Sequence, residues 1–273
     1  EWLINTWNDA LSYILNNGMN TRKLVLMDVF DFIQNKNYST LKFNSYLPEQ
    51  VSPMSDVDLC IQKSDSEHLI DYIKNHSLVR TMNIYNQSFM KNAEIFLINT
   101  DLLSIDCIWK LKRKNLIIHD ISKLINQSFT NAFGVKKANI KDEVEYINKF
   151  YAINKSTPPN THYSRSFELK LQCIAHHKSI DNKQKVLKAL LRNKSENKGL
   201  NYIINTIGYG IDVIRNLAQQ KGFVVTFSGV DGAGKSTLIE ITKKQINKQL
   251  RKPVVVLRHR PSLLPIISAW KYG

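Results

Sequence analysis

Cysteine, glycine and proline are scarce in this chain, which has 3, 10 and 7 of them among 273 residues. The cysteines (Cys60, Cys107 and Cys173) show no CxxC spacing, which argues against a disulfide framework, and we interpret them as reduced core residues. No apolar run reaches the roughly 18 residues of a membrane span, and no secretory signal opens the sequence. With 43% hydrophobic residues, the expectation is a cytoplasmic enzyme with more than one core.

Acidic residues are outnumbered, with 23 Asp and Glu against 38 Lys and Arg and a net charge of +15. Residues 1–110 hold 9 basic and 13 acidic residues, so residues 111–273 hold 29 (38 − 9) basic and 10 (23 − 13) acidic ones. Such a field can attract nucleic acid, an anionic lipid surface or a phosphorylated polymer, with Lys110–Lys114 lining a substrate groove. We favour a solvated helical face for this stretch, because no aromatic stacking pattern accompanies it.

The most informative motif is Gly229–Ser236, which completes the pattern GxxxxGK[ST] of a phosphate-binding P-loop. A β-branched and aromatic run precedes it at 222–228, and an amphipathic helix is predicted from Ser236 onward. The motif predicts binding of ATP or another nucleoside triphosphate, with catalytic Lys235 on the β/γ oxygens and Ser236 on Mg²⁺. The expected nucleotide-binding residues are Gly229, Asp231, Gly232, Ala233, Gly234, Lys235, Ser236 and Thr237.

The segment Phe227–Thr237 resembles the start of the thymidylate kinases and their relatives. The resemblance implies a second strand, here Pro253–Leu257, that leads to an arginine holding the acceptor's phosphate. Arg260 is the first choice for this substrate-binding role and Arg258 the second, while a solvated basic loop is the alternative. The resemblance also implies that Asp231 lies near the metal and the acceptor, and that the ATP γ-phosphoryl group passes to a nucleoside monophosphate or similar acceptor.

The P-loop region is short for such a domain. Only 38 residues (273 − 235) follow Lys235, whereas a doubly wound domain needs about 100–150. The chain also begins at Glu1 instead of a methionine. We therefore expect a fragment that holds the β-α-β start of an α/β P-loop kinase domain, with the lid and the remaining kinase residues outside it. In this form it should bind phosphate poorly and transfer none.

Two aspartates in the N-terminal third, Asp56 and Asp58, are separated by one residue inside the apolar, strand-like run 55–61. Residues i and i+2 of a strand project from one face. Paired carboxylates in a buried strand repel each other, so the pattern indicates a divalent cation that neutralises them. A third carboxylate, Asp106, lies within a second apolar run at 102–109. Three such groups can hold two Mg²⁺ ions for an in-line phosphoryl or nucleotidyl displacement; strand-end acids facing water are the alternative.

This arrangement resembles the polymerase-β-type nucleotidyltransferase superfamily. Its signature is a Gly-Ser pair, a spacer of about ten residues, Ser-Asp-x-Asp and a later strand aspartate. Ser45 lies at the required distance before Asp56 and is an expected nucleotide-binding residue, but Asn44 replaces the glycine. Asparagine tolerates the left-handed conformation better than most residues, so we expect the turn to survive with weakened nucleotide affinity. The resemblance implies that Asp56, Asp58 and Asp106 are catalytic metal ligands.

Three regions follow from these motifs. We expect an α+β nucleotidyltransferase-like domain over 1–110, of which the resemblance covers about 20–110, a mostly helical connector or substrate region over 111–220, and a truncated P-loop domain over 221–273. The pattern predicts helices at 2–17, 21–34 and 66–75 and strands at 38–43, 56–61, 80–85, 93–99 and 103–109, the last three antiparallel.

The connector carries little chemical signal. A linker is predicted at 156–160 and a helix break at 208–210, before a last helix over 211–220. His176 and His177 suggest a metal site, as does His162. We reject it because adjacent residues of a helix point about 100° apart.

Together the motifs predict a two-module enzyme that uses ATP or another NTP and Mg²⁺. The P-loop module would phosphorylate a nucleotide-like acceptor, and the N-terminal module would move a nucleoside monophosphate onto an acceptor hydroxyl or phosphate. Two alternatives stay open. One is a nucleotidyltransferase that modifies RNA, protein or a small molecule and has a regulatory P-loop. The other is a non-catalytic, nucleotide-gated protein whose basic half binds nucleic acid.

Overall fold

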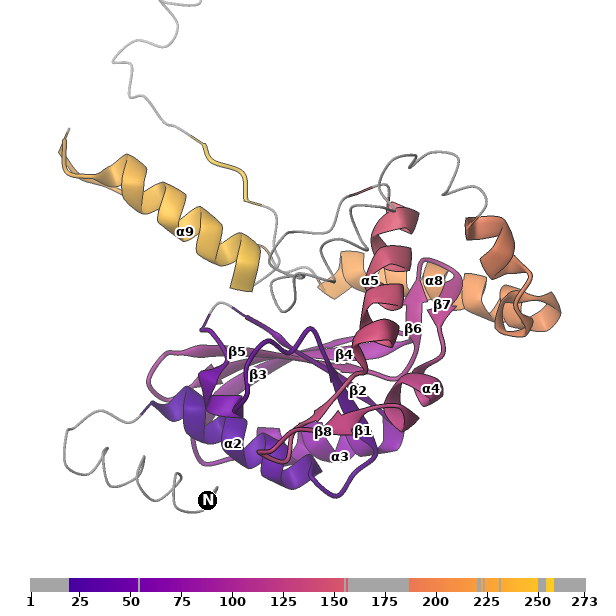
Figure 1. Cartoon of the computed structure of the whole chain (residues 1–273). Coiled ribbons are helices and arrows are strands. Elements are labelled where there is room, and N and C mark those ends of the chain that lie inside the picture. Colours follow the sequence, from indigo (N-terminus) through magenta and orange to yellow (C-terminus); the bar gives the residue numbers. More distant parts are fainter. Residues whose placement is uncertain are drawn as a thin grey trace, which may run out of the picture. The chain divides into compact units, whose positions relative to one another are not determined.

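The computed structural model describes residues 20–53, 55–154, 156, 187–219, 222, 224–230, 232–249 and 254–257. The chain divides into two compact units, Glu1–Val224 and Val225–Gly273, each of which is described by itself (Figure 1). Several expectations fall outside the described residues: the helix at 2–17, most of the linker at 156–160, His162, Cys173, His176, His177, Asp231, Arg258 and Arg260.

The first unit is built on a mixed sheet of seven strands in the order β3-β4-β5-β2-β1-β9-β8. Neighbouring strands are antiparallel except for the parallel pairs β2–β5 and β1–β9. The strands are β1 (Tyr38–Leu41), β2 (Val57–Ile61), β3 (Val79–Asn86), β4 (Met90–Leu97), β5 (Leu102–Ile108), β8 (Phe129–Thr130) and β9 (Lys136–Lys137). The α+β class expected for this region therefore agrees with the structure.

The pairing of β5 differs in part from the expectation. β5 is antiparallel to β4, as predicted, but it lies parallel to β2 on its other side. Parallel neighbours need a long crossover, and the chain provides one through α3 (Lys63–Lys74) and the β3–β4 hairpin. Strand patterns alone do not reveal which edge of β2 the returning chain joins.

One face of the sheet packs against α2 (Thr21–Ile33) and α3, which lie together on the same side in Figure 1. Side chains alternate between the two faces of a strand, so Val57 and Leu59 of β2 enter this core. Asp58 and Cys60 then point to the opposite face. The Asn20 side chain accepts a hydrogen bond from the Lys23 N–H, which caps the first turn of α2.

The opposite face carries a smaller apolar cluster that includes Leu41, Cys60, Met90 and Ile108. The short helix α4 (Ile121–Asn126) contributes Leu124 to it. Further described elements of this unit are the 3-10 turns at Pro48–Gln50 and Ser195–Asn197, the hairpin β6 (Leu111–Arg113) and β7 (Leu116–His119), and the helices α5 (Ile140–Asn154) and α8 (Gly199–Gln219).

The expectation of a mostly helical connector over 111–220 is wrong for its first part, because the strands β6, β7, β8 and β9 lie between Leu111 and Lys137. Only Lys114 and Asn115 separate β6 from β7, and Lys114 has a positive φ of 55°. Two-residue hairpin turns usually signal themselves by Asn-Gly or Asp-Gly. Lysine at a left-handed position gives no such signal.

The helix break expected at 208–210 is also wrong, since α8 runs unbroken through these residues. Glycine inside a helix lowers helix stability by roughly 1 kcal/mol relative to alanine. At position 208 the packing explains the glycine. A Cβ atom there would lie 3.3 Å from the Ser88 Oγ. Gly208 therefore lets the helix approach the β3–β4 hairpin closely.

Polar groups hold α8 against the sheet. The Asp212 carboxylate accepts hydrogen bonds from the Ser88 N–H and from the Ser88 hydroxyl, both at 2.6 Å. Lys112 Nζ donates to the Ser88 Oγ at 3.2 Å and to the Asn205 carbonyl at 3.1 Å. Asn205, Asp212 and Lys112 are all buried, so the side of α8 that faces the domain is polar.

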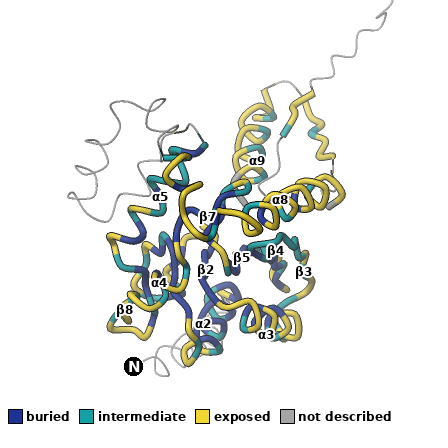
Figure 2. The backbone as a smooth tube through the Cα atoms, turned by 90° about the vertical axis from the view of Figure 1, so that its right-hand side faces the viewer, coloured by how far each residue is buried: buried dark blue, intermediate teal, exposed yellow. Residues whose placement is uncertain are grey.

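Much of α8 is exposed, as its yellow stretches show in Figure 2, and many of its exposed residues are apolar. Its exposed aliphatic residues are Leu200, Ile203, Ile204, Ile207, Ile211, Val213, Ile214 and Leu217. Within the part of the chain that the structure describes, no helix combines the length and apolar character needed to cross a bilayer.

Replacing Asp212 with alanine should loosen α8. The change removes the acceptor of both Ser88 donors and the counter-charge near buried Lys112. Loss of such a buried charged partner costs about 3 kcal/mol, so amide exchange in 199–219 should accelerate roughly a hundredfold, as measured by hydrogen–deuterium exchange.

The control variant is Asp71→Ala, which removes an exposed carboxylate from α3. Its exchange in 199–219 should match the wild type. Unchanged protection of α8 in Asp212→Ala would contradict the role given to this polar contact.

Candidate metal-dependent active site

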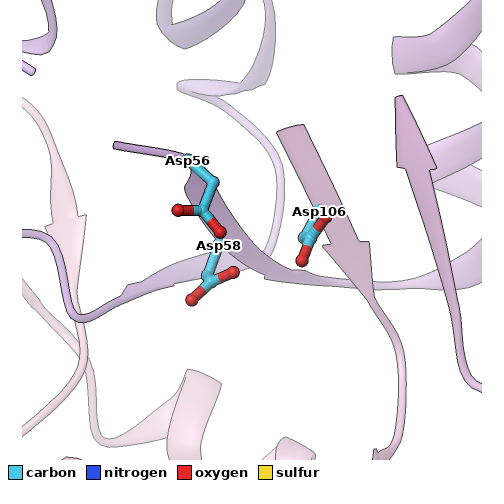
Figure 3. Close-up of side chains that lie close together, drawn as sticks. All are labelled: Asp56, Asp58 and Asp106. Carbon is cyan, nitrogen blue, oxygen red and sulfur yellow. The ribbon is translucent and has the colours of Figure 1, made fainter. Parts of the chain in front are cut away.

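Three carboxylates meet at the centre of the sheet, on the face opposite α2 and α3. Asp58 of β2 lies directly beside Asp106 of β5 in the parallel register, and Asp56 precedes β2 by one residue. Figure 3 shows the three side chains directed to the same region, and one ligand oxygen from each lies within 4.8 Å of the others. Asp58 and Asp106 are buried, whereas Asp56 is exposed. The structure thus brings together the three aspartates that the sequence singled out.

Two neighbours offset the repulsion among these carboxylates. The Lys42 ammonium forms an ion pair with Asp58. The Asn92 side-chain amide of β4 donates to Asp106 Oδ1 at 2.6 Å and to the Ser104 Oγ at 3.0 Å. Burial by itself would lower the pKa of Lys42, but the Asp58 carboxylate outweighs it and raises the pKa above its usual range. Lys42 therefore stays a cation at this site.

The backbone at Lys42 bends in the left-handed region, with φ of 53°. Its N–H donates to the carboxylate of Glu143 in α5. The expectation for Asn44 is wrong in this respect, because among the described residues of this loop the positive φ falls on Lys42 and not on Asn44. The turn that directs the chain away from β1 is thus made two residues earlier than the Asn44–Ser45 match suggested.

Ser45, the expected nucleotide-binding residue, lies in a loop that a lysine of β9 contacts. Lys137 Nζ of β9 donates to the Ser45 carbonyl oxygen at 2.8 Å. The same ammonium lies 5.5 Å from the ring centres of Phe43 and Tyr46, which adds cation–π attraction. This leaves the Ser45 loop next to two cations, Lys42 and Lys137.

An arginine of α2 positions the segment that leads into the triad. The Arg22 guanidinium donates to the carbonyl oxygens of Val51, Ser52 and Ser55 at 2.5, 2.9 and 3.1 Å. Arg22 is buried, and this burial lowers the pKa of its side chain. Three bonds from one rigid fork fix the backbone immediately before Asp56.

Sequence reasoning missed Arg22, Lys42, Asn92, Lys137 and Glu143. Each of them contacts the triad or its loops only in the folded structure, and no sequence motif with a short, fixed spacing connects it to the aspartates. Only Lys42 had a local signal, since it is a charged residue near the end of the strand predicted at 38–43.

The two described cysteines are not candidates for chemistry. Cys60 and Cys107 are buried and unpaired with each other, as expected for core residues. Burial raises the pKa of the Cys60 thiol well above its usual value and raises the pKa of Cys107 to about 12. Neither forms a reactive thiolate near neutral pH.

In the second unit, the described part of the P-loop leads into helix α9 (Lys235–Gln249), close to the start that the sequence predicts. Gly232 and Gly234 have φ of 85° and 76°, conformations that suit glycine. Lys235 Nζ donates to the carbonyl oxygens of Gly229 and Val230, both at 2.6 Å. The loop therefore curls around the ammonium of its own lysine.

The strands expected on both sides of the P-loop are not formed in the described residues 224–230 and 254–257. A strand exists through hydrogen bonds to a neighbour, and these described residues belong to neither of the two sheets. Of the expected β-α-β unit, the described residues form the helix but not the two strands.

No protein-family model matches this chain, and no curated protein matches it. Among solved structures, the crystal structure of the Megavirus polyadenylate synthase is similar, with a TM-score of 0.28 and 13% sequence identity. The similarity covers 85% of this chain and 44% of that chain, so the chain spans less than half of that protein's length.

The ion pair between Lys42 and Asp58 predicts how the triad responds to Mg²⁺. In Lys42→Met the carboxylates lose their nearest cation, so the metal-free protein should be less stable and Mg²⁺ should bind about tenfold more tightly. The Mg²⁺-dependent rise in Tm at low ionic strength should therefore exceed that of the wild type.

The matched control is Lys36→Met. The Lys36 ammonium lies 3.4 Å from the Asp65 carboxylate, an ion pair that does not involve the triad. It should leave the Mg²⁺ response unchanged. An equal Mg²⁺-dependent rise in the wild type and in Lys42→Met would show that Lys42 does not act on the cation site.

Proposed function

We propose that the first unit is a metal-dependent nucleotidyltransferase. The observation that carries this proposal is the convergence of Asp56, Asp58 and Asp106, with ligand oxygens within 4.8 Å of one another on two adjacent parallel strands. Oxygen ligands of this kind suit Mg²⁺. The donor set therefore fits the cation that the sequence predicts.

The three aspartates would hold Mg²⁺, which when bound neutralises phosphate charge and polarises the reacting phosphoryl group. The protein itself positions the aspartates that would bind the metal. Arg22 fixes the loop before Asp56, and Asn92 orients Asp106 through its amide hydrogen bond. An NTP would place its triphosphate near Lys42 and the Ser45 loop, where the ammonium groups of Lys42 and Lys137 lie.

In the proposed reaction, an acceptor hydroxyl oxygen attacks the α-phosphorus of the NTP. A new oxygen–phosphorus bond forms, and the bond between the α-phosphorus and the bridging oxygen breaks. Pyrophosphate leaves with the bonding electrons, and the hydroxyl proton passes to Asp106. The requirement for in-line geometry explains why three side chains from two strands and a preceding loop are held so firmly.

A second activity, nucleotide binding by the P-loop, is favoured by the glycine conformations at Gly232 and Gly234 and by the start of α9 at Lys235. Backbone N–H groups at a helix N-terminus attract phosphate. For this unit we further propose transfer of the ATP γ-phosphoryl group to a nucleoside monophosphate or a similar acceptor. It rests on the Phe227–Thr237 resemblance, and Arg260 or Arg258 would hold the acceptor.

The triad is tested with isosteric amides. Asp58→Asn and Asp106→Asn keep the shape of the side chains but remove ligand charge, so release of pyrophosphate from an NTP should fall at least a thousandfold. Asp71→Asn, an exposed change on α3, should retain wild-type turnover. Retained turnover in both triad variants would refute the nucleotidyltransferase proposal.

The P-loop is tested separately with Lys235→Ala. Removal of this ammonium should weaken ATP binding to the second unit about tenfold or more, measured by calorimetry in an Asp58→Asn background that silences the first site. Lys244→Ala, later on the same helix, is the control. Equal ATP affinity in both variants would contradict a phosphate-binding role for Lys235.

A further inference from the structure

Eight polar residues form a two-row grid on the sheet face that carries the triad. The strand register places Asp58, Asp106, Asn92 and Tyr85 side by side across β2, β5, β4 and β3. The second row runs parallel to the first. Its members are Ser104 of β5, Glu94 of β4 and Asn83 of β3, and Asp56, one residue before β2, extends the same row.

Four members of the grid lie on β4 and β3. Asn92 is hydrogen-bonded to Asp106, whereas Glu94, Tyr85 and Asn83 form a separate hydrogen-bonded group. Glu94 is buried, and its carboxylate accepts hydrogen bonds from the Tyr85 hydroxyl at 3.1 Å and from the Asn83 amide at 3.5 Å. Burial, followed by the Glu94 charge, raises the pKa of Tyr85 to about 12. The phenol thus stays protonated beside a carboxylate.

A buried carboxylate on a sheet face calls for a reason, because burial of a charge is costly unless it is paired. Glu94 has hydrogen bonds from two neutral donors, and none of the eight grid residues is a cation. The nearby Lys91 of β4 alternates to the other face and pairs with Glu67 of α3 at 3.5 Å. A ligand that donates hydrogen bonds would complete this arrangement.

Charge is distributed unequally on the two sides of the triad. On the β1 and β9 side lie Lys42, paired with Asp58, and Lys137, bonded to the Ser45 carbonyl. On the β4 side lies Glu94. An anionic triphosphate is therefore attracted to the first side, and the second substrate is left with the Glu94 side.

We propose that the grid of Asn92, Glu94, Tyr85 and Asn83 binds the acceptor, and that the acceptor is a polyhydroxylated, sugar-like molecule without phosphate groups. This inference rests on the proposed nucleotidyl transfer. Carboxylate, amide and phenol groups at strand spacing offer several acceptors and donors to neighbouring hydroxyls. The same carboxylate repels a phosphate ester or a nucleic acid backbone. The hydroxyl that lies nearest Asp106 is the one that attacks the α-phosphorus.

The experiment measures transfer of label from α-³²P-ATP with Mg²⁺ to three acceptor pools of equal concentration. The first contains unphosphorylated mono- and disaccharides, the second contains the phosphate esters of the same sugars, and the third contains mixed-sequence RNA. Label should appear in the first pool at least tenfold faster than in the others. No label in the first pool, or faster label in either of the others, overturns the inference.

Two variants tie the preference to the grid. Glu94→Gln should slow transfer to the sugar pool at least tenfold and reduce its advantage over the phosphorylated pool, while the Kd for Mg·ATP stays unchanged. Asn83→Ala, at an exposed position on the same row, should slow transfer about threefold without loss of fold. Glu67→Gln removes a carboxylate from the opposite side of the sheet and should behave as the wild type. An unchanged preference in both grid variants overturns the inference.

Failure of the inference is distinguishable from failure of the proposed function. If Mg·ATP binding depends on Asp58 but label enters RNA or phosphorylated sugars, the nucleotidyltransferase assignment stands and the acceptor class is wrong. If Mg·ATP binding and pyrophosphate release are unaffected by Asp58→Asn, both are wrong.

Discussion

The parallel pairing of β2 with β5 is the constraint on which the candidate site depends. It places the Cα atoms of Asp58 and Asp106 opposite each other, and Asp56 then joins them from the start of β2. Like charges at this separation oppose folding unless they are neutralised. Lys42 supplies one neutralising charge and Asn92 a hydrogen bond. A divalent cation bound to the three carboxylates would lower their repulsion further.

The hydrophobic core sets this register indirectly. Val57 faces Ile105 and Leu59 faces Cys107, and all four side chains pack toward α2 and α3. A slip of one residue would turn these apolar groups out of the core and the aspartates into it. The large free-energy cost of such a slip fixes the aspartates without any interaction of their own. Packing on one face of the sheet thus determines the chemistry available on the other.

The sequence predicted the parts of the site that follow local rules. Asp56 and Asp58 were found because spacing of two on an apolar strand puts both on one face, and Asp106 because a lone carboxylate interrupts another strand. The partners Lys42, Lys137 and Glu143 were missed, since their contacts depend on how β1, β9 and α5 are arranged. The β6–β7 hairpin and the unbroken α8 were missed because local propensity disfavours the roles of two residues. Lys114 adopts a left-handed turn conformation, and Gly208 lies inside a helix where its small size allows close packing against Ser88.

Two cations of the basic stretch at 110–114 are engaged inside the protein. Of the basic stretch at 110–114, Lys112 is buried against Ser88 and Asn205, which neither the groove nor the solvated-face interpretation anticipated. Arg113 bonds the Asn154 side chain at 2.7 Å and lies 4.9 Å from the centre of the Phe150 ring. Cations engaged in this way stabilise the fold around α5 and α8 and have little freedom to follow a phosphate backbone. Net charge counts residues, whereas recognition of a polyanion depends on how many of them remain directed to solvent. Lys112 and Arg113 add to the net charge of the chain, but their side chains bind groups of the protein itself.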